Sequence, residues 1–191
     1  MKKLLLLIPI ALLVFIFLYV SGYRFTAKSA AEAHSFLKND STLIQKVESN
    51  FGELFVYKTE DYYITIVPEK IGLLFRASSS ITTQDINDKS DKVRTIGWAS
   101  GLYSDKSGTI MVIEVQDVNI AYIEAGSELQ RIRKNVIKGE NLILEWDKGH
   151  FVHEINAIAY SEKGEKLYFY GYDPATPNFI DQKELRWRKV Q

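Results

Sequence analysis

The sequence predicts a mainly β protein: an antiparallel sandwich or barrel of about nine to eleven short strands, preceded by one transmembrane helix and one short amphipathic helix. Three observations support this fold class. An uncharged apolar run fills the N-terminus, apolar and polar residues alternate with a period of two along most of the chain, and turn-forming residues recur at intervals of roughly 8–12 residues. We divide the chain into residues 1–23, 24–41 and 42–191, the last forming a single β-rich domain.

The first segment, residues 1–23, is predicted to be a membrane anchor. Two lysines precede Leu4–Val20, which contains no charged residue. Extended through Tyr23, the run is long enough to span a hydrocarbon core of about 30 Å at about 1.5 Å per residue. The lysines favour a cytoplasmic N-terminus, which leaves the rest of the chain extracytoplasmic. Small residues after the run, Gly22 and Ala27, leave open a cleaved signal peptide and a secreted product.

Residues 24–41 are predicted to form a spacer followed by a short helix. Ser29-Ala-Ala-Glu32 has the spacing of a capping box, in which the serine and glutamate side chains each accept from a free backbone N–H. Apolar residues recur at helical spacing as far as Lys38, and Asn39-Asp-Ser41 predicts the end of the helix. One side of this helix is apolar enough to dock on the following domain.

The β-rich domain begins where the period changes to two. Leu54–Tyr57 and Tyr62–Val67 predict a hairpin that is buried on both faces. Residues 82–92 are polar and acidic, which predicts a mobile loop. The other predicted strands and hairpins are 72–81, 93–103 with 109–116, 119–123, 131–137 with 142–147, 155–161 with 166–173, and 184–190.

Charge and cysteine content exclude several classes of function. The chain has 24 Lys and Arg against 24 Asp and Glu, so it has no basic excess for nucleic-acid binding. It contains no cysteine, which excludes disulfides, a thiol nucleophile and thiolate zinc sites. An exported domain of this kind must be stabilised by the packing of its core alone.

The sequence offers few groups for catalysis. A serine triad needs a histidine base, and only His34, His150 and His153 are available. Gly97-Trp-Ala-Ser-Gly101 places its serine one position too late for G-x-S-x-G. His150 and His153 lack the H-E-x-x-H order of zinc proteases, and Asp85–Asp91 lacks the central glycine of a calcium loop. We therefore predict no enzyme, cofactor or metal, and keep a cell-envelope hydrolase using carboxylates or a metal near His150 and His153 as the alternative.

Aromatic residues give the remaining candidate site. Tyr168, Tyr170 and Tyr172 fall on one face of a predicted strand. Trp98, on another predicted strand, is a further candidate. If Leu167 and Phe169 fill the core, the three tyrosines form an exposed ladder that can stack on sugar rings or anchor a protein. The other possibility is that the strand is central in the fold and the tyrosines pack inside it.

Four stretches carry a resemblance to known proteins. They are Gly72-Leu-Leu-Phe-Arg-Ala77, Val93-Arg-Thr-Ile-Gly-Trp98, Tyr168-Phe-Tyr-Gly-Tyr172 and Leu185-Arg-Trp187. With these stretches the chain resembles a group of membrane-anchored extracytoplasmic proteins of Bacillus-type Gram-positive bacteria. The resemblance implies the same location and carries over no activity and no site.

These observations predict a non-enzymatic binding or interaction module, tethered to the cell membrane and facing the cell envelope. Its expected partners are the membrane, through the N-terminal span, and an envelope protein or glycan. A further possibility is a structural or regulatory partner of another membrane protein, with the span itself as the interface.

Overall fold

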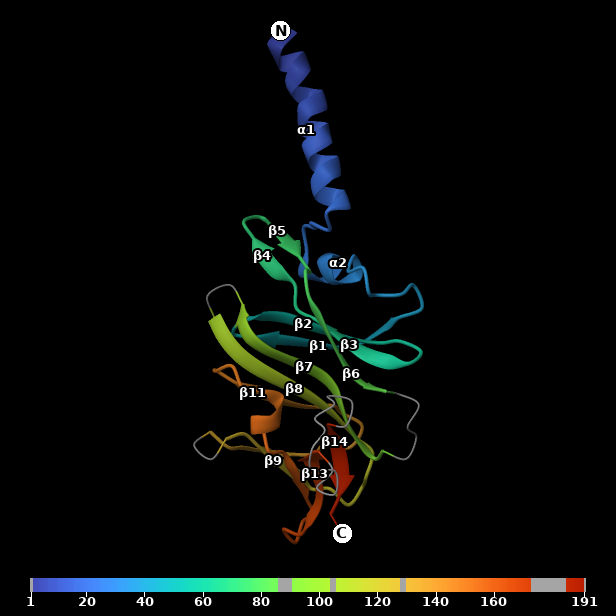
Figure 1. Cartoon of the computed structure of the whole chain (residues 1–191), viewed down its shortest axis with the longest axis vertical. Helices are drawn as coiled ribbons and strands as arrows, with labels where there is room; N and C mark the ends of the chain where they lie inside the picture. Colours follow the sequence, from blue (N-terminus) through green and yellow to red (C-terminus); the bar gives the residue numbers. More distant parts are fainter. Residues whose placement is uncertain (1, 86–90, 104–105, 128–129, 173–184, 191) are drawn as a thin grey trace.

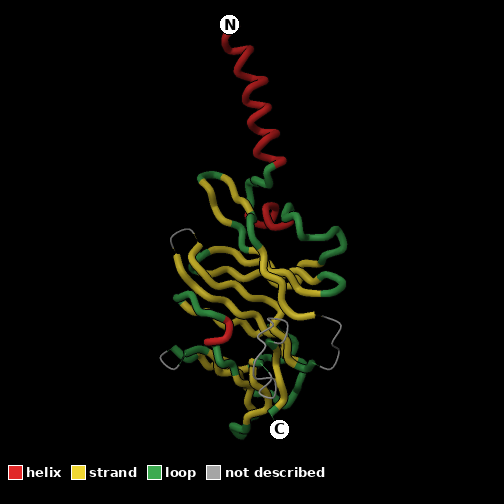
Figure 2. Tube along the Cα trace, in the orientation of Figure 1, coloured by secondary structure: helices red, strands yellow, loops and turns green. Residues whose placement is uncertain are grey.

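The computed structural model describes residues 2–85, 91–103, 106–127, 130–172 and 185–190. Within these residues the chain forms fourteen strands, two α-helices and one short 3-10 helix, η1 (Val152–Glu154). The mainly β class with antiparallel pairing is confirmed. The number of strands is higher than predicted, because residues 42–49 and 69–71 also form strands and the predicted strand over 72–81 is divided in two. Figure 2 shows the strands gathered in one body below the N-terminal helix.

Helix α1 (Lys2–Val20) extends away from this body (Figure 1). The side chains of its large apolar residues are exposed from Ile8 to Val20, apart from a half-buried Leu18. Among the described residues, no helix has both the length and the apolar character needed to cross a membrane. Membrane crossing by residues 1–23 stays a prediction.

Helix α2 (Ala27–Glu32) is shorter than predicted and begins earlier. Thr26, in an extended conformation, is the N-cap, and its hydroxyl oxygen accepts from the Ser29 backbone N–H at 3.1 Å. The predicted capping box on Ser29 and Glu32 is therefore wrong, and so is the extension to Lys38. Because Thr26, three positions earlier, accepts from the Ser29 N–H, Ser29 lies inside the helix and is not its N-cap.

A four-stranded sheet lies next to α2. Its order is β1 (Thr42–Ser49), β2 (Gly52–Lys58), β3 (Tyr62–Ile66) and β6 (Ser80–Asp85), all antiparallel. The predicted hairpin β2–β3 is confirmed. The predicted loop over 82–92 is wrong at its start, because β6 runs to Asp85; residues 86–90 lie outside the described residues.

The predicted strand over 72–81 is wrong and is replaced by a small hairpin. β4 (Glu69–Ile71) pairs with β5 (Leu74–Arg76) across Gly72 and Leu73. Gly72 has φ +62°, which suits the first central position of a two-residue hairpin turn. The hairpin lies beside the end of α1 that joins the body (Figure 1).

A three-stranded sheet occupies the middle of the body, in the order β11 (Leu142–Trp146), β8 (Lys106–Val115) and β7 (Val93–Tyr103). The predicted pairing of 93–103 with 109–116 is confirmed. The predicted pairing of 131–137 with 142–147 is wrong, because β11 pairs with β8 instead.

A five-stranded sheet completes the body. Its order is β10 (Ile132–Asn135), β9 (Tyr122–Ala125), β12 (Ile158–Tyr160), β13 (Lys166–Gly171) and β14 (Arg186–Lys189). The predicted hairpin of 155–161 with 166–173 corresponds to β12–β13, and the final predicted strand to β14.

The three sheets are stacked, and strand β8 explains how. Ile110 and Val112 pack in a cluster shared with the four-stranded sheet, whereas Met111 and Ile113 pack in a cluster shared with the five-stranded sheet. All four side chains are fully buried, as expected for a strand covered on both faces. The stack follows the long axis of the molecule, so the five-stranded sheet forms the end farthest from α1 (Figure 1).

A smaller cluster closes the stack on the side of α1. Ala27 and Ala31 of α2 pack on the outer face of the four-stranded sheet, against Phe55, Tyr57 and Ile64. Two alanines allow the helix backbone to approach the sheet closely. The layers therefore run from α2 through three sheets to the distal end of the body.

Candidate functional site

The four aromatic residues predicted as a site do not share one open surface. Tyr168 and Trp98 are each 8% exposed and belong to the core between the three- and five-stranded sheets. Tyr170 packs on Trp187, with ring centroids 5.5 Å apart, and Tyr172 is half-buried. The exposed ladder is therefore wrong: the β13 face that carries Tyr168 and Tyr170 points into the stack, which was the other possibility.

His150 and His153 lie in different environments. The backbone N–H of His150 donates to Ser100 Oγ at 3.0 Å and Thr109 Oγ1 at 2.8 Å, and Ser100 Oγ donates to the His150 carbonyl at 2.6 Å. His153 is exposed and stacks on Phe151. Ser100 thus forms hydrogen bonds with the main chain of His150 and holds the loop before η1 on the three-stranded sheet.

A metal centre requires several ligands in one place. In the described part of the chain, no group of three or more His, Asp or Glu side chains is placed to hold a metal ion. The acidic stretch Asp85–Asp91 lies mostly outside the described residues, so it is not tested. The hydrolase with a metal near His150 and His153 stays a prediction without support from this geometry.

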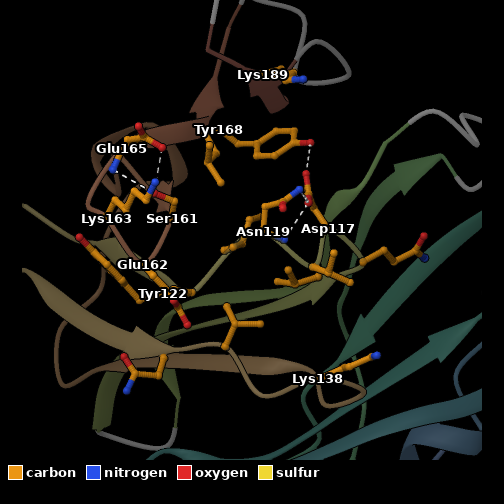
Figure 3. A pocket seen from close by; sticks show the side chains of 18 of the residues that line it. Asp117, Asn119, Tyr122, Lys138, Ser161, Glu162, Lys163, Glu165, Tyr168 and Lys189 are labelled. Atoms are coloured by element: carbon orange, nitrogen blue, oxygen red, sulfur yellow. Dashed lines mark hydrogen bonds between the residues drawn. The ribbon is translucent and has the colours of Figure 1, made fainter.

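A cleft with a volume of about 1260 Å³ lies beside the five-stranded sheet, toward the distal end of the body. Four segments that are far apart in sequence form it: 115–122 after β8, 133–139 around the end of β10, 161–168 around the β12–β13 turn, and Lys189 of β14. Figure 3 shows their side chains converging from several elements. We refer to this hollow as the distal cleft.

One wall of the distal cleft is built around Asp117. Tyr168 Oη donates to Asp117 Oδ2 at 2.7 Å, and the Asn119 backbone N–H and Nδ2 donate to Asp117 Oδ1 at 3.0 and 2.8 Å. Figure 3 shows Tyr168 reaching across to this carboxylate. The Asx-type bond from Asn119 folds the 117–119 segment, and the buried tyrosine fixes it to the five-stranded sheet.

The electrostatics of this pair favour binding over proton transfer. The pKa of Asp117 is lowered, chiefly by the Asn119 backbone N–H, with further hydrogen bonds from Tyr168 and the Asn119 side chain. Burial, and then the hydrogen bond to Asp117, raise the pKa of Tyr168 to about 12. Both groups keep one protonation state near neutral pH, whereas a general acid or base needs a pKa close to the working pH.

A second wall is aromatic and cationic. Tyr122 of β9 lies directly opposite Tyr160 of β12, and their rings stack at 5.0 Å with an angle of 12°. On the other neighbouring strand, the Arg133 guanidinium lies 3.5 Å from the centroid of the Tyr122 ring. Because β9 runs between β10 and β12, Tyr122 is held between Tyr160 and Arg133.

The β12–β13 turn forms the rim. The Ser161 backbone N–H donates to the Glu165 carbonyl at 2.9 Å, and the Glu165 N–H donates to Ser161 Oγ at 3.2 Å. Gly164, at φ +81°, provides the left-handed residue that this tight turn needs. The turn directs Glu162 and Lys163 toward solvent.

The lining of the cleft carries charges of both signs. Its basic residues are Arg133, Lys138, Lys163 and Lys189, and its acidic residues are Asp117, Glu162 and Glu165. With the amides of Asn119 and Asn135, this lining offers hydrogen-bond donors and acceptors on several sides. A polar ligand that carries both donors and acceptors fits such a surface better than an apolar one.

Sequence reasoning found only Tyr168 among these residues, and assigned it to the wrong surface. Two local signals were available. Asp117-Val-Asn119 has the composition of an Asx turn, and Tyr122 and Tyr160 each fall in a predicted strand. Their proximity depends on the β9–β12 pairing, which joins residues far apart in the chain and leaves no local mark.

Comparisons with known proteins add no relative to this picture. No protein-family model, no curated protein and no solved structure matches the chain.

Proposed function

We propose that the protein is a non-enzymatic binding module on the extracytoplasmic side of the cell membrane, attached through α1 and binding a polar envelope ligand in the distal cleft. The observation that carries the proposal is the position of the cleft. Its walls come from segments in and beside the five-stranded sheet, and this sheet forms the end of the body farthest from α1 (Figure 1). A module attached through α1 would therefore present the cleft to the cell envelope.

The exposed apolar surface of α1 supports attachment to a membrane. Side chains such as Leu13, Phe17 and Val20 are 67%, 68% and 79% exposed. A continuous apolar surface of this kind is unfavourable in water and favourable in lipid. Two lysines at the N-terminal end of α1 support a cytoplasmic N-terminus and hence an extracytoplasmic body.

The first test uses charge reversal at the rim of the cleft. Lys138 and Lys163 are exposed and line it, so Lys138→Glu with Lys163→Glu changes the potential of the cleft without touching the core. Lys58→Glu, on an exposed position of β2, is the matched control. For an anionic ligand we expect binding to fall about tenfold, since rim charge pairs are each worth up to about 1 kcal/mol.

Calorimetric titration of the full-length chain in detergent with anionic cell-wall glycan fragments is the measurement. Weaker binding by the double variant and unchanged binding by Lys58→Glu would support a glycan ligand in the cleft. Equal binding by all three proteins would place the glycan elsewhere.

A protein ligand is tested by site-specific photo-crosslinking in intact cells. Val118 is 79% exposed at the cleft, and Phe36 is 67% exposed in the loop after α2. A cleft-bound protein gives an adduct from position 118 that is absent from position 36 and is lost in the charge-reversed variant. Without such an adduct and without glycan binding, the proposed function is wrong.

A further inference from the structure

The hairpin β4–β5 has an apolar tip in a place where turns are usually polar. Ile71 pairs with Leu74, and Gly72 and Leu73 form the turn between them. Leu73 is 90% exposed and Ile71 is 47% exposed. Turn positions favour Gly, Asn, Asp, Ser and Pro, and a leucine there gains no burial within its own chain. The tip of this hairpin therefore presents apolar surface to its surroundings.

This tip faces the outer part of α1 across a shared groove of about 530 Å³. Phe15, Leu18 and Tyr19 line it from the helix, and Ile71, Leu73 and Leu74 line it from the hairpin. Phe15 and Leu18 belong to the uncharged run. Tyr23, Arg24 and Phe25 also line this groove, so the hairpin tip lies beside the junction between the apolar end of α1 and the segment that follows it.

Backbone hydrogen bonds fix this relation. The Arg24 N–H donates to the Phe75 carbonyl at 2.9 Å, and the Phe75 N–H donates to the Arg24 carbonyl at 2.7 Å. Arg24 also caps α1, because its Nη1 donates to the Tyr19 carbonyl at 2.7 Å. The end of the helix and the hairpin are thus joined by one antiparallel bridge and one arginine.

Cationic and aromatic groups surround the apolar tip on the side of the body. The Arg24 guanidinium lies 3.9 Å from the Tyr19 ring centroid, and that of Arg76 lies 5.3 Å from the Tyr23 ring centroid. Lys70 is exposed on the same hairpin. Arginine and lysine with tyrosine above an apolar surface is the arrangement found at a lipid headgroup layer, where long cationic side chains reach the phosphates.

We propose that the tip Ile71–Leu74 inserts into the outer leaflet beside α1, with Arg24, Lys70 and Arg76 at the phosphate groups of anionic lipids. The proposal rests on membrane attachment through α1 and adds a second point of contact. Two contacts joined by the Arg24–Phe75 bridge fix the tilt and rotation of the body on the membrane, which a single helix would leave free.

The absence of cysteine makes the test direct, because each introduced cysteine is the only one in the chain. Leu73→Cys reports on the tip, Leu13→Cys on α1, and Val118→Cys on the distal end; these positions are 90%, 67% and 79% exposed, so the core is undisturbed. Each full-length variant carries an environment-sensitive dye and is reconstituted into vesicles of phosphatidylcholine and phosphatidylglycerol. A second set of vesicles contains lipids with a spin label on the acyl chain.

We expect the dyes at positions 13 and 73 to shift to the blue and to be quenched by the spin-labelled lipids. The dye at position 118 should show neither effect. Quenching at position 13 with a water-like spectrum at position 73 would leave the anchor in place and overturn the hairpin insertion. A blue shift at position 73 without quenching would mean that protein, such as a second copy of the chain, covers the tip, which also overturns it.

The two proposals fail in different ways. Absence of quenching at position 13 alone removes attachment through α1, while quenching at position 73 would still show that the hairpin enters lipid. Absence of quenching at both positions removes both.

Discussion

The Asp117–Tyr168 hydrogen bond is the residue-level feature on which the distal cleft depends. It joins the segment after β8 to the middle of β13 through one carboxylate and one buried phenol. The bond involves a charged acceptor and is partly buried, so it is of the stronger kind. Removing the hydroxyl leaves the ring in the core and takes away the bond alone.

We expect Tyr168→Phe to lower the free energy of unfolding by about 1.5–3 kcal/mol. Tyr160→Phe is the matched control, since its ring stacks on Tyr122 and the stack survives loss of the hydroxyl. Urea unfolding of both variants and the wild type measures the difference. An equal loss in the two variants would show that the carboxylate contributes nothing specific.

The same variant gives a pH dependence with a definite sign. The pKa of Tyr168 is raised in the folded protein to about 12. Its contribution to stability is therefore complete below about pH 10, the ordinary pKa of tyrosine, and is lost as the pH rises through the raised pKa of about 12. The pKa of Asp117 is lowered, so its contribution is complete above about pH 4 and is lost as the pH falls through the lowered value.

The stability difference between wild type and Tyr168→Phe should therefore be constant at intermediate pH and should decrease at both extremes. Urea unfolding of both proteins at a series of pH values measures this difference. A difference that does not change at alkaline pH would contradict the assignment of a raised pKa to Tyr168.

At the scale of elements, the close approach of β7 to its neighbours depends on Gly97. A Cβ at this position would lie 2.7 Å from Val56 Cγ2 and 3.2 Å from Val112 Cβ. β7 has a register shift between Thr95 and Gly97, which leaves little freedom to move the backbone. We expect Gly97→Ala to destabilise the protein by about 1–3 kcal/mol through overpacking.

Gly149→Ala is the control for this substitution, because the nearest atoms to its Cβ are 3.8 Å away. Thermal unfolding followed by far-ultraviolet circular dichroism compares the two variants. If Gly149→Ala lowers the midpoint as much as Gly97→Ala does, the contact with Val56 is not the cause.

The elements also show how much of the fold could be predicted from the sequence. The predicted strand over 142–147 is confirmed as β11, and its alternating residues Leu142, Leu144 and Trp146 are all buried on one side of it. The partner of that strand was predicted wrongly. Alternation fixes the face of a strand but not its neighbour, and a short connection favours the nearest strand in sequence. Here β11 pairs with β8, and β10 pairs with β9.

The candidate site was harder to predict from the sequence for a similar reason. An aromatic ladder is visible in one stretch of sequence, but which face of β13 is covered depends on the second sheet that packs on it. The distal cleft is assembled from four separate segments, so no single stretch carries its pattern.

At the scale of the molecule, the three stacked sheets should unfold as one unit, because the three-stranded sheet supplies side chains to both cores. Trp98, Trp146 and Trp187 all lie in the core next to the five-stranded sheet. Ile110 lies in the other core and is fully buried. Ile110→Ala should cost about 2–5 kcal/mol. Tryptophan fluorescence should report this loss although all three tryptophans belong to the other core.

Coincident midpoints by fluorescence and far-ultraviolet circular dichroism are the expected outcome for the Ile110→Ala variant. Ile137→Ala, at a position that is 60% exposed, should leave both midpoints unchanged. A fluorescence midpoint that stays at the wild-type value in Ile110→Ala would show that the two cores melt independently.

The stacking direction has a consequence for what the protein can reach. Packed sheets are about 10 Å apart, so the two steps from the four-stranded to the five-stranded sheet raise the distal cleft by about 20 Å. Under the proposed attachment through α1 and the hairpin, the stacked sheets would hold the distal cleft at a constant height above the bilayer. Its ligand would then have to extend well above the bilayer surface or approach from the side of the cell wall.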